Sequence, residues 1–357
     1  MPAPLNAENV RRAPKVLLHD HLDGGLRPQT VLELADRVGY RALPASDAES
    51  LGRWFRAAAD SGSLVRYLET FAHTVGVMQS PEAVQRVARE CARDLAADGV
   101  VYAEVRMAPE LLGPGMPLEA AVEAMLDGYA QGSREAADTG TPIRIGTLLC
   151  AMRQDDRWDE VAGLVVRYRD AGVVGFDLAG PEIGFPPDRI PSAVALLDRA
   201  GAHRTVHAGE AAGIDSIVAA LDGAGAERLG HGVRIADEVG ADGTLGPVAQ
   251  RVRDQQVTLE IAPSSNVQTG AYPSLADHPV DRLHRLGLAV TLNTDNRLMS
   301  GVSVTSEVTD VATTFGWTWE DVRTVTERAL AGAFLPDDER RRLLDDVVRP
   351  GYAALLG

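Results

Sequence analysis

The feature that most constrains the fold is a regular alternation of two kinds of segment along the chain. Short apolar runs rich in β-branched residues are separated, in most cases, by roughly 20–35 residues whose apolar positions follow helical spacing, as in residues 80–99. Strands that alternate with helices in this way predict βαβ units and a parallel sheet of the α/β class. Eight such units predict a closed (β/α)8 barrel, the TIM barrel, rather than an open sheet. The eight runs that we read as strands are residues 16–23, 100–108, 143–152, 172–180, 204–210, 227–232, 257–266 and 289–296.

The chain length and the longest gap between strands indicate what surrounds this barrel. A chain of 357 residues is long enough for two domains, but one α/β barrel can run from about 200 to beyond 400 residues, so we expect a single domain over residues 1–357. Residues 24–99 are too many for one connecting helix, and they predict extra helices over the C-terminal mouth of the barrel. The stretch from about residue 304 predicts further helices on the far side. No GxGxxG motif follows the first strand, as a dinucleotide-binding fold would require.

Charge and hydropathy exclude several kinds of partner. The formal net charge is −16, and an acidic surface repels phosphate backbones, so we expect no nucleic acid partner. Nowhere do 18 apolar residues run together, and residues 1–19 lack the apolar run of a signal peptide, so we expect a soluble, cytoplasmic protein without membrane contact. Cys91 and Cys150 lie far apart without a CxxC motif, which indicates neither a disulfide framework nor a thiolate metal site. The sequence leaves the oligomeric state open.

Polar residues stand at the C-terminal ends of the predicted strands, where barrel enzymes build their sites. His19 and His21 are two residues apart and therefore point to the same side of the first strand. His207 ends the fifth strand, His231 the sixth and Asp295 the eighth. Imidazoles with one carboxylate form a nitrogen and oxygen donor set that suits zinc or another divalent transition metal. Such a site, without cysteine ligands, also has room for a water molecule, whose pKa the metal lowers toward neutrality.

Each of these motifs also has an explanation without a metal. The HxH pair at residues 19–21 can be hydrogen-bonded core, HAGE can begin a helix with Glu210 in its first turn, GHG can be a tight turn, and Asp295 can cap a helix. Four such coincidences at successive strand ends would be needed, so a single site explains the pattern better. The remaining histidines stand in helical or loop contexts, and we interpret them as surface or hydrogen-bonded core residues: His73, His203, His278 and His284.

A single lysine among the 35 basic residues, Lys15, narrows the chemistry further. A Schiff-base aldolase needs a lysine inside the barrel, and barrel hydrolases with two metals commonly bridge them by a modified lysine. Lys15 precedes the first strand and suits neither role, so we expect one metal ion per chain. The chain also contains no GxSxG elbow, Walker loop or HExxH motif, which leaves a serine hydrolase, a P-loop enzyme or a zincin without support.

Four short motifs stand at the predicted strand ends: HxHLDG at residues 19–24, HAGE at 207–210, GHG at 230–232 and NTD at 293–295. Together with the segments around them, they resemble the adenosine deaminase family. The combination of HxHLDG, HAGE, GHG and NTD is highly specific. The resemblance implies a barrel with one zinc ion and the hydrolytic deamination of a 6-aminopurine, with adenosine and 2′-deoxyadenosine as the expected substrates. The resembling segments keep the family order from about residue 14 to 350 and read PKVLLHDHLDGGLRP, DGVVYAEVRMAPELL, MRQDDRW, GFDLAGPE, HAGE, RLGHG, APSSNVQTGA, LNTDN and AFLPDDERRRLL.

Carried over position by position, the resemblance implies a role for each residue of the cluster. Glu210 matches the glutamate that protonates the purine ring beside the attacked carbon, and His231 matches the histidine that orients the water and supports its attack. Asp295 is expected both to bind zinc and to hydrogen-bond the water, and His21 also to lie beside the substrate. The family's zinc ligands correspond to His19, His21, His207 and Asp295.

Three further positions are implied to contact the nucleoside. Gly180 matches a glycine whose backbone N–H contacts a purine ring nitrogen, and Asp23 matches an aspartate that faces the ribose hydroxyl. Asn296 departs from the better-known pattern, because many members carry a second aspartate there. That carboxyl must be protonated to donate to purine N7, whereas an asparagine amide donates without protonation. The change is therefore compatible with a purine but weakens the transfer of the exact substrate.

Other functions remain open at this point. The nearest alternative is deamination of adenine or another 6-aminopurine nucleoside, although Asp23 favours a ribosyl substrate. A non-catalytic purine-binding protein on the same scaffold would be expected to have lost a ligand or the glutamate, and neither is lost. A zinc-stabilised structural barrel would need neither Glu210 nor His231.

Overall fold

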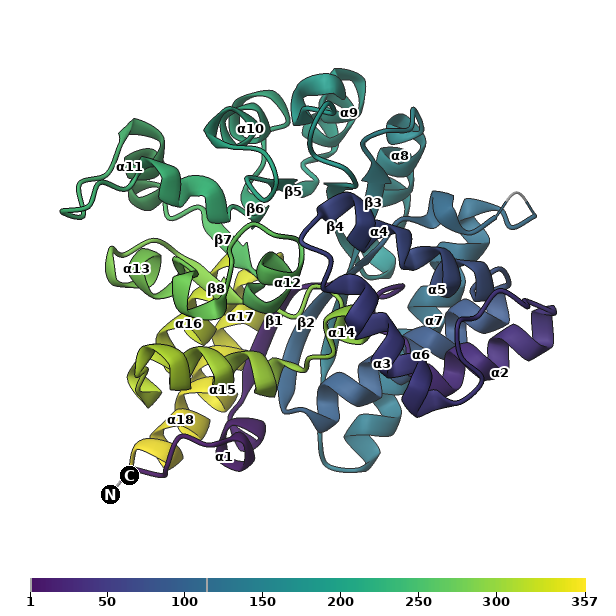
Figure 1. Ribbon diagram of the computed structural model, residues 1–357, viewed down its shortest axis with the longest axis horizontal. Coiled ribbons are helices and arrows are strands. Elements are labelled where there is room, and N and C mark those ends of the chain that lie inside the picture. The colour runs from purple at the N-terminus through teal and green to yellow at the C-terminus, as the bar shows by residue number, and fades with distance from the viewer. Residues whose placement is uncertain (1, 114) are drawn as a thin grey trace.

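The computed structural model describes residues 2–113 and 115–357. Eight parallel strands follow one another around the centre of the molecule in chain order, with helices outside them (Figure 1). Every predicted run overlaps one of these strands, which confirms the predicted (β/α)8 barrel. The strands are β1 (Lys15–His21), β2 (Val100–Met107), β3 (Arg144–Met152), β4 (Val173–Ala179), β5 (His203–Ala208), β6 (Arg228–His231), β7 (Thr258–Ile261) and β8 (Val290–Leu292).

The strands are apolar on their outer faces because helices cover the outside of the barrel. In β4, Phe176 and Leu178 are fully buried, and the intervening Asp177 is fully buried on the opposite face of the strand. A charged side chain inside the barrel is costly unless it has partners there. The interior carboxylates and guanidinium groups are paired with one another, as described below.

The barrel closes between its first strand and the segment after its last strand, at residues that are predicted to bind metal. The Asp295 backbone N–H donates to the His19 carbonyl across 3.0 Å, and the His21 N–H donates to the Asp295 carbonyl across 2.7 Å. These two hydrogen bonds hold the backbones of His19, His21 and Asp295 in a defined arrangement. Closure of the barrel and assembly of the cluster therefore depend on the same contacts.

The connecting helices show the amphipathic pattern expected from the sequence. α6 (Pro81–Ala97) begins after Ser80, whose side chain accepts a hydrogen bond from the Ala83 N–H across 3.2 Å, and its proline lies in the first turn. Its apolar side, including Val84 and Leu95, is buried against the barrel. The other helices are α1 (Ala7–Arg12), α2 (Pro28–Val38), α3 (Ala48–Ala59), α4 (Leu64–Glu69), α5 (Phe71–Val77), α7 (Leu118–Asp138), α8 (Trp158–Tyr168), α9 (Pro191–Ala200), α10 (Ile214–Val218), α11 (Pro247–Asp254), α12 (Pro263–Gln268), α13 (Val280–Arg285), α14 (Arg297–Ser300), α15 (Val304–Phe315), α16 (Trp319–Gly332), α17 (Asp337–Arg342) and α18 (Arg349–Leu356).

The long first connection carries extra helices, α2 to α6, as predicted. In Figure 1, α3 and α4 cross in front of the strands. α4 and α5 contribute apolar side chains to the wall of the cavity at the mouth of the barrel. The residues of this connection therefore close one side of the candidate site.

Two predicted strands, 257–266 and 289–296, end four or five residues earlier than the sequence pattern suggests. The run at 257–266 stops at Ile261 because Pro263 begins α12, and a proline has no N–H for a sheet but suits the first turn of a helix. The run at 289–296 stops at Leu292, and Asp295 has a φ of 55°, in the left-handed region that strands do not use. Both breaks lie at the mouth of the barrel, where the candidate site is found.

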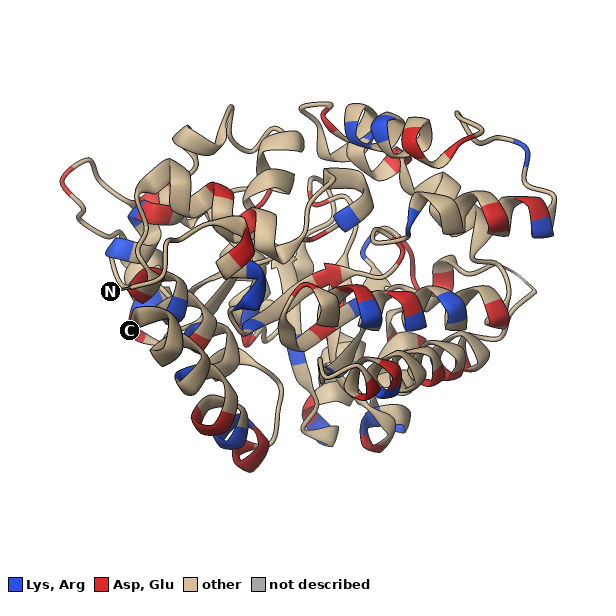
Figure 2. Ribbon diagram, turned by 90° about the horizontal axis from the view of Figure 1, so that it is seen from below, with Lys and Arg blue, Asp and Glu red and all other residues tan. Residues whose placement is uncertain are grey.

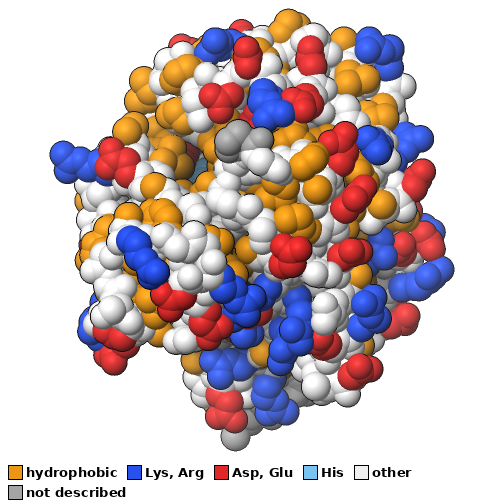
Figure 3. All heavy atoms as spheres, turned by 90° about the vertical axis from the view of Figure 1, so that its right-hand side faces the viewer, with side chains coloured by type: hydrophobic (Ala, Val, Ile, Leu, Met, Phe, Trp, Pro, Cys, Tyr) orange, Lys and Arg blue, Asp and Glu red, His pale blue; other side chains and the backbone are white. Residues whose placement is uncertain are grey.

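The outer surface mixes both signs of charge. Acidic and basic residues are interspersed along the outer helices (Figure 2), and they lie next to one another across the face shown in Figure 3. In residues 2–113 and 115–357, no helix is both long enough and apolar enough to cross a membrane. Lys15 is buried at the start of β1, where its ammonium group donates to the Val10, Arg11 and Ala13 carbonyls. It therefore lies at the opposite end of the strand from the predicted ligands.

Candidate active site

The predicted metal-binding residues come together at the C-terminal end of the barrel. One ligand atom from each of four residues lies within 4.8 Å of the others: His19, His207, His231 and Asp295. His21 joins the same cluster, because its Nε2 lies 3.3 Å from His207 Nε2 and 3.3 Å from Asp295 Oδ1. Four imidazoles and one carboxylate thus surround a common point. Which imidazoles bind metal depends on where their protons are.

The rings of His19 and His207 are held by carboxylates on the side away from the cluster. His19 Nδ1 lies 2.9 Å from the Glu260 carboxylate, and His207 Nδ1 lies 3.0 Å from that of Asp177. A carboxylate in this position accepts an N–H, so the lone pair of each imidazole is left on Nε2, where a metal can bind it. His19 Nε2 is buried and has no hydrogen-bond partner among the described residues.

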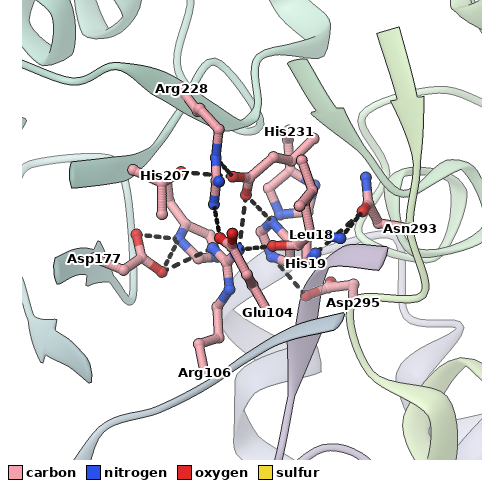
Figure 4. A network of polar contacts seen from close by, with 12 residues as sticks. Leu18, His19, Glu104, Arg106, Asp177, His207, Arg228, His231, Asn293 and Asp295 are labelled. Atoms are coloured by element: carbon pink, nitrogen blue, oxygen red, sulfur yellow. Dashed lines mark hydrogen bonds and ion pairs between the residues drawn. The ribbon is translucent and has the colours of Figure 1, made fainter. Parts of the chain in front are cut away.

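These two carboxylates belong to a buried network of ion pairs between strands of the barrel, in which Figure 4 labels Glu104, Arg106, Asp177 and Arg228. Arg106 bridges them, since its guanidinium lies 2.9 Å from Asp177 and 2.8 Å from Glu260. Arg228 lies 2.7 Å from Glu260 and 2.6 Å from Glu104. Although burial acts to raise the pKa of Glu260, the two guanidinium groups hold it well below the usual range. The carboxylate that supports His19 is therefore ionised.

The network and the cluster together carry an excess of negative charge. At formal charges, two guanidinium groups and four carboxylates give a net charge of −2, and Asp295 is the one carboxylate of the four without a guanidinium partner. A buried charge excess of this kind is costly, and one divalent cation would balance it. The six groups are Arg106, Arg228, Glu104, Asp177, Glu260 and Asp295.

Asp295 presents one carboxylate oxygen to the cluster. The Ser265 hydroxyl donates to Oδ2 across 2.6 Å, while Oδ1 lies 3.2 Å from His19 Nε2. Burial acts to raise the pKa of Asp295, but the neighbouring imidazoles of His19, His231 and His21 hold it well below the usual value. The helix cap that the sequence allowed as an alternative is wrong, because the residue at the N-cap of α14 is Asn296.

Strain is concentrated at this site. His231 and Asp295 have φ values of 60° and 55°, and they are two of the three non-glycine residues with positive φ in the described part of the chain. Side chains other than glycine avoid this conformation, and it persists at functional sites where surrounding contacts hold it in place. The left-handed backbone at the last residue of β6 and at Asp295 after β8 therefore accompanies the two side chains that join the cluster.

Glu210 lies beside the cluster and is 5% exposed. The Thr269 hydroxyl donates to its Oε1 across 3.0 Å, and its Oε2 lies 3.6 Å from His231 Nε2. Burial, and then the charges of Asp295 and Glu182, raise the pKa of Glu210 to about 8. The alternative that HAGE begins a helix is wrong, since α10 starts at Ile214. Glu210 is therefore a carboxylic acid at neutral pH, as a proton donor must be.

The cluster forms the floor of a cavity of about 460 Å³, which is the usual size of a small-molecule site. Its walls combine predicted site residues with apolar side chains. Among the predicted residues, the lining includes His21, Asp23, Gly180, His207, Glu210, His231, Asp295 and Asn296. The apolar wall includes Leu64, Leu68, Phe71, Val75, Leu111 and Met152.

The three residues expected to contact a nucleoside also line this cavity. Gly180 has a φ of 104°, a backbone conformation that residues with a Cβ rarely adopt, so glycine is favoured there. Burial raises the pKa of Asp23 to about 7, and its Oδ1 has no hydrogen-bond partner in the described part of the chain. Asn296 is buried, and its Oδ1 likewise lacks a described partner. Unpaired buried polar atoms of this kind are the groups that a polar ligand satisfies.

Several supporting residues were missed by the sequence interpretation. Glu260, Asp177 and Arg106 are charged residues within apolar strands, and this was the signal that could have identified them. Glu182, which holds the loop of Glu210, follows β4 in the segment GPE without any distinctive pattern. His278 was interpreted as a surface or core residue; it is buried and hydrogen-bonded, but through Asn266 it is also connected to His231.

Comparison with known proteins agrees with this geometry. A family model described as adenosine deaminase matches residues 14–350. A curated adenosine deaminase of Mycolicibacterium vanbaalenii is 55% identical and covers 100% of both chains, and adenosine deaminase 1 of Streptomyces coelicolor is 55% identical over 98% of this chain and 89% of its own. A crystal structure described as adenine deaminase from Arthrobacter aurescens is 27% identical and has a TM-score of 0.81, covering 94% of this chain and 98% of that one.

Proposed function

The chain belongs to the adenosine deaminase family, and from this premise we infer that its cavity binds adenosine and hydrolyses it to inosine and ammonia. The observation that carries this conclusion is the buried Glu210 beside a cluster of imidazoles and one carboxylate at the floor of the cavity. The 2′-deoxy nucleoside is proposed as a second substrate. The whole chain is proposed to act as one domain, in the cytoplasm.

The side chains of the cluster fit one zinc ion. His19 and His207 have their Nδ1 atoms engaged by carboxylates, so that Nε2 is free to bind. Asp295 offers Oδ1, and the excess of two negative charges in the surrounding network suits a dication. We propose His19, His21, His207 and Asp295 as the ligands, a set typical of a catalytic site with room for water. When bound, zinc lowers the pKa of water from 15.7 to about 7 and so supplies a nucleophile at neutral pH.

Glu210 is proposed to deliver the proton that the purine ring needs. Attack at the carbon that carries the amino group places negative charge on the adjacent ring nitrogen, and a general acid prevents this charge from building up. Glu210 is protonated at neutral pH, and its carboxyl lines the cavity. His231 and Asp295 are proposed to orient the attacking water by hydrogen bonds, because both side chains belong to the cluster and both line the cavity.

The nucleoside itself is proposed to be held by groups around the cavity. The Gly180 backbone N–H is expected to contact a purine ring nitrogen, and the Asn296 amide to donate to N7. Asp23 is expected to meet the ribose hydroxyl, since a buried carboxyl without a described partner requires one. The apolar wall excludes water from the reacting face, which strengthens each of these polar contacts.

Deamination of adenine is the second candidate, because one of the solved structures similar to this chain is described as an adenine deaminase. Initial rates followed by ultraviolet absorbance on adenosine, 2′-deoxyadenosine, adenine and larger 6-aminopurine nucleosides separate the two. We expect the highest kcat/KM on adenosine. A higher kcat/KM on adenine, or no turnover of any nucleoside by zinc-loaded protein, would contradict the proposal.

A further inference from the structure

His231 stands at one end of a chain of hydrogen bonds that leads away from the cavity. Its Nδ1 lies 3.0 Å from Asn266 Nδ2, and Asn266 Oδ1 lies 3.3 Å from His278 Nε2. At the far end, the backbone N–H of Val280 lies 3.1 Å from His278 Nδ1. All four residues are at most 3% exposed, so no bulk water competes for these contacts.

The Val280 N–H fixes the direction of every hydrogen bond in the series from Val280 to His231, because a backbone N–H can only donate. His278 Nδ1 must accept, so the neutral ring carries its proton on Nε2. That N–H needs an acceptor, and the atom of Asn266 that faces it is therefore the carbonyl oxygen. The amide nitrogen of Asn266 is left to face His231, and it can only donate. His231 Nδ1 is thus an acceptor without a proton.

We infer that Asn266 and His278 are positioning residues that hold His231 in the tautomer with its proton on Nε2, the nitrogen on the side of Glu210. His231 then presents an N–H donor to the site instead of a lone pair. It cannot bind a metal through Nε2, although it lies in the same cluster as His19, His207 and Asp295. The inference rests on the proposed function only for the presence of a metal and of a substrate.

The opposite tautomer of His231 is inconsistent with the hydrogen bond at the other end of this series, between the Val280 N–H and His278. If His231 Nε2 bound metal, its Nδ1 would carry the proton and would need the carbonyl oxygen of Asn266. The amide nitrogen of Asn266 would then face His278 Nε2, which would have to accept. His278 Nδ1 would carry the proton and point it at the Val280 N–H across 3.1 Å, so two donors would face each other. A doubly protonated His278 meets the same conflict, and burial lowers the pKa of His278 to about 3.

The hydrogen bonds therefore sort the imidazoles of the cluster into two classes. His19 and His207 donate from Nδ1 to carboxylates and offer a lone pair on Nε2, as ligands do. His231 accepts at Nδ1 and offers an N–H on Nε2. The position of His231 does not distinguish it from the ligands. Its hydrogen-bond partner, the amide of Asn266, does. This tautomer excludes His231 as a nitrogen ligand, which leaves His21, the remaining imidazole of the cluster, as the third.

The tautomer can be observed directly by nuclear magnetic resonance. Zinc-loaded protein labelled with ¹⁵N-histidine gives two-bond ¹H–¹⁵N spectra in which protonated and unprotonated ring nitrogens differ, and the His231 signals are identified by their loss in His231→Gln. We expect an Nε2–H ring for His231 and Nδ1–H rings for His19 and His207. A protonated Nδ1 on His231 would overturn the inference.

Zinc analysis gives a second test. The His231→Gln variant should keep one zinc per chain, and the His21→Gln variant should lose it. The reverse result would also overturn the inference.

Variants of the two positioning residues separate a tautomer effect from a general loss of structure. Asn266→Asp offers only acceptors, so the His231 proton should move to Nδ1 and kcat should fall at least 10-fold, since a wrong imidazole tautomer can cost up to about 10⁴-fold. His278→Gln keeps a donor toward Asn266 and should keep the tautomer, whereas His278→Phe should not. His284→Gln, at a buried histidine elsewhere in the fold, serves as the control for stability.

The outcomes distinguish this inference from the proposed function. An unchanged His231 tautomer in both Asn266→Asp and His278→Phe would show that these residues do not set it, and full activity with the altered tautomer would show that it does not matter to the reaction. A wild-type protein with the expected tautomer but no adenosine turnover would contradict the proposed function and still support the inference.

Discussion

The carboxylate of Glu182 accepts the backbone N–H of Glu210 across 3.1 Å. The same carboxylate accepts the N–H groups of residues 209, 211 and 212 and the hydroxyl of Ser216. Burial acts to raise the pKa of Glu182, but Ser216 and these amides hold it below the usual value. Glu182 therefore stays ionised, fixes the loop that carries Glu210, and adds negative charge beside it.

The pH dependence of the reaction should follow Glu210. Its pKa is raised to about 8, first by burial and then by Asp295 and Glu182. A proton donor works only in its protonated form, so kcat/KM on adenosine should be maintained near neutral pH and fall as the pH rises through about 8. Initial rates between pH 6 and about pH 10 measure this. A profile that stays flat across that range would contradict the assignment of Glu210 as the acid.

Glu182→Gln should move this alkaline fall in activity to lower pH. Removing a negative charge near Glu210 makes its ionisation easier, so its pKa should decrease. The variant also replaces one acceptor oxygen by an NH2 group, so some of the backbone N–H groups lose their hydrogen-bond acceptor. This should lower the free energy of unfolding by about 1–3 kcal/mol. Glu238→Gln is the matched control, because Glu238 likewise accepts two backbone N–H groups, from Val248 and Ala249. It should lose stability without any shift of the pH profile, and an equal shift in both variants would refute the electrostatic explanation.

Glu210→Gln should lose the chemical step and keep the metal. Glutamine preserves the shape and an N–H donor but cannot transfer an acidic proton. General acid catalysis contributes about 10²–10⁴-fold, so kcat should fall by at least 100-fold. Single-turnover rates and metal analysis of the same preparation check both halves of the prediction. Near-normal turnover would remove Glu210 from the mechanism.

Removal of the metal should abolish activity reversibly. The four proposed ligands lie together in the cluster that also contains His231, and the buried network has an excess of two negative charges, so about one zinc per chain is expected. Dialysis against a chelator should remove activity, and added zinc should restore it. Elemental analysis that finds two tightly bound ions, or none in an active preparation, is incompatible with this model.

Asn296 should discriminate against purines that lack N7. If its amide donates to that atom, replacing N7 by C–H leaves a buried donor unpaired, at a cost of roughly 1–3 kcal/mol. The 7-deaza analogue of adenosine should therefore lose about 5- to 150-fold in kcat/KM. Asn296→Ala should lose a similar amount on adenosine, with little further discrimination against the analogue.

Asn296→Asp provides the sharper comparison, because it introduces the residue that many family members carry. It should retain activity and lose it at higher pH, since its carboxyl must be protonated to donate to N7. Should Asn296→Ala discriminate against the 7-deaza compound as strongly as the wild type does, Asn296 would not be the partner of N7. Its position beside Asp295 would then be better explained as support for that ligand.

The eight strands and the main site residues could be predicted from the sequence because the signals for both are local. A strand is recognised from its own apolar run, and the carboxyl ends of parallel strands necessarily meet at one end of a barrel. His19, His21, His207, His231 and Asp295 were predicted from such strand ends, and the role of Glu210 came from the family resemblance. The early ends of the seventh and eighth strands were not foreseen. Pro263 marked the first of them in the sequence and was overlooked, whereas the left-handed conformation of Asp295 shows only in the folded backbone.

Only the tertiary structure decided which protons these residues carry. The partner of His19 is Glu260, 241 positions away in the chain. Arg106, which bridges Glu260 on β7 and Asp177 on β4, comes from another strand, β2. The tautomer of His231 depends on a loop histidine, His278, acting through Asn266. A hydrogen bond acts over about 3 Å and depends on direction, so residue types at strand ends can identify the members of a cluster. Their roles as ligand, donor or acid depend on neighbours that the fold alone brings within reach.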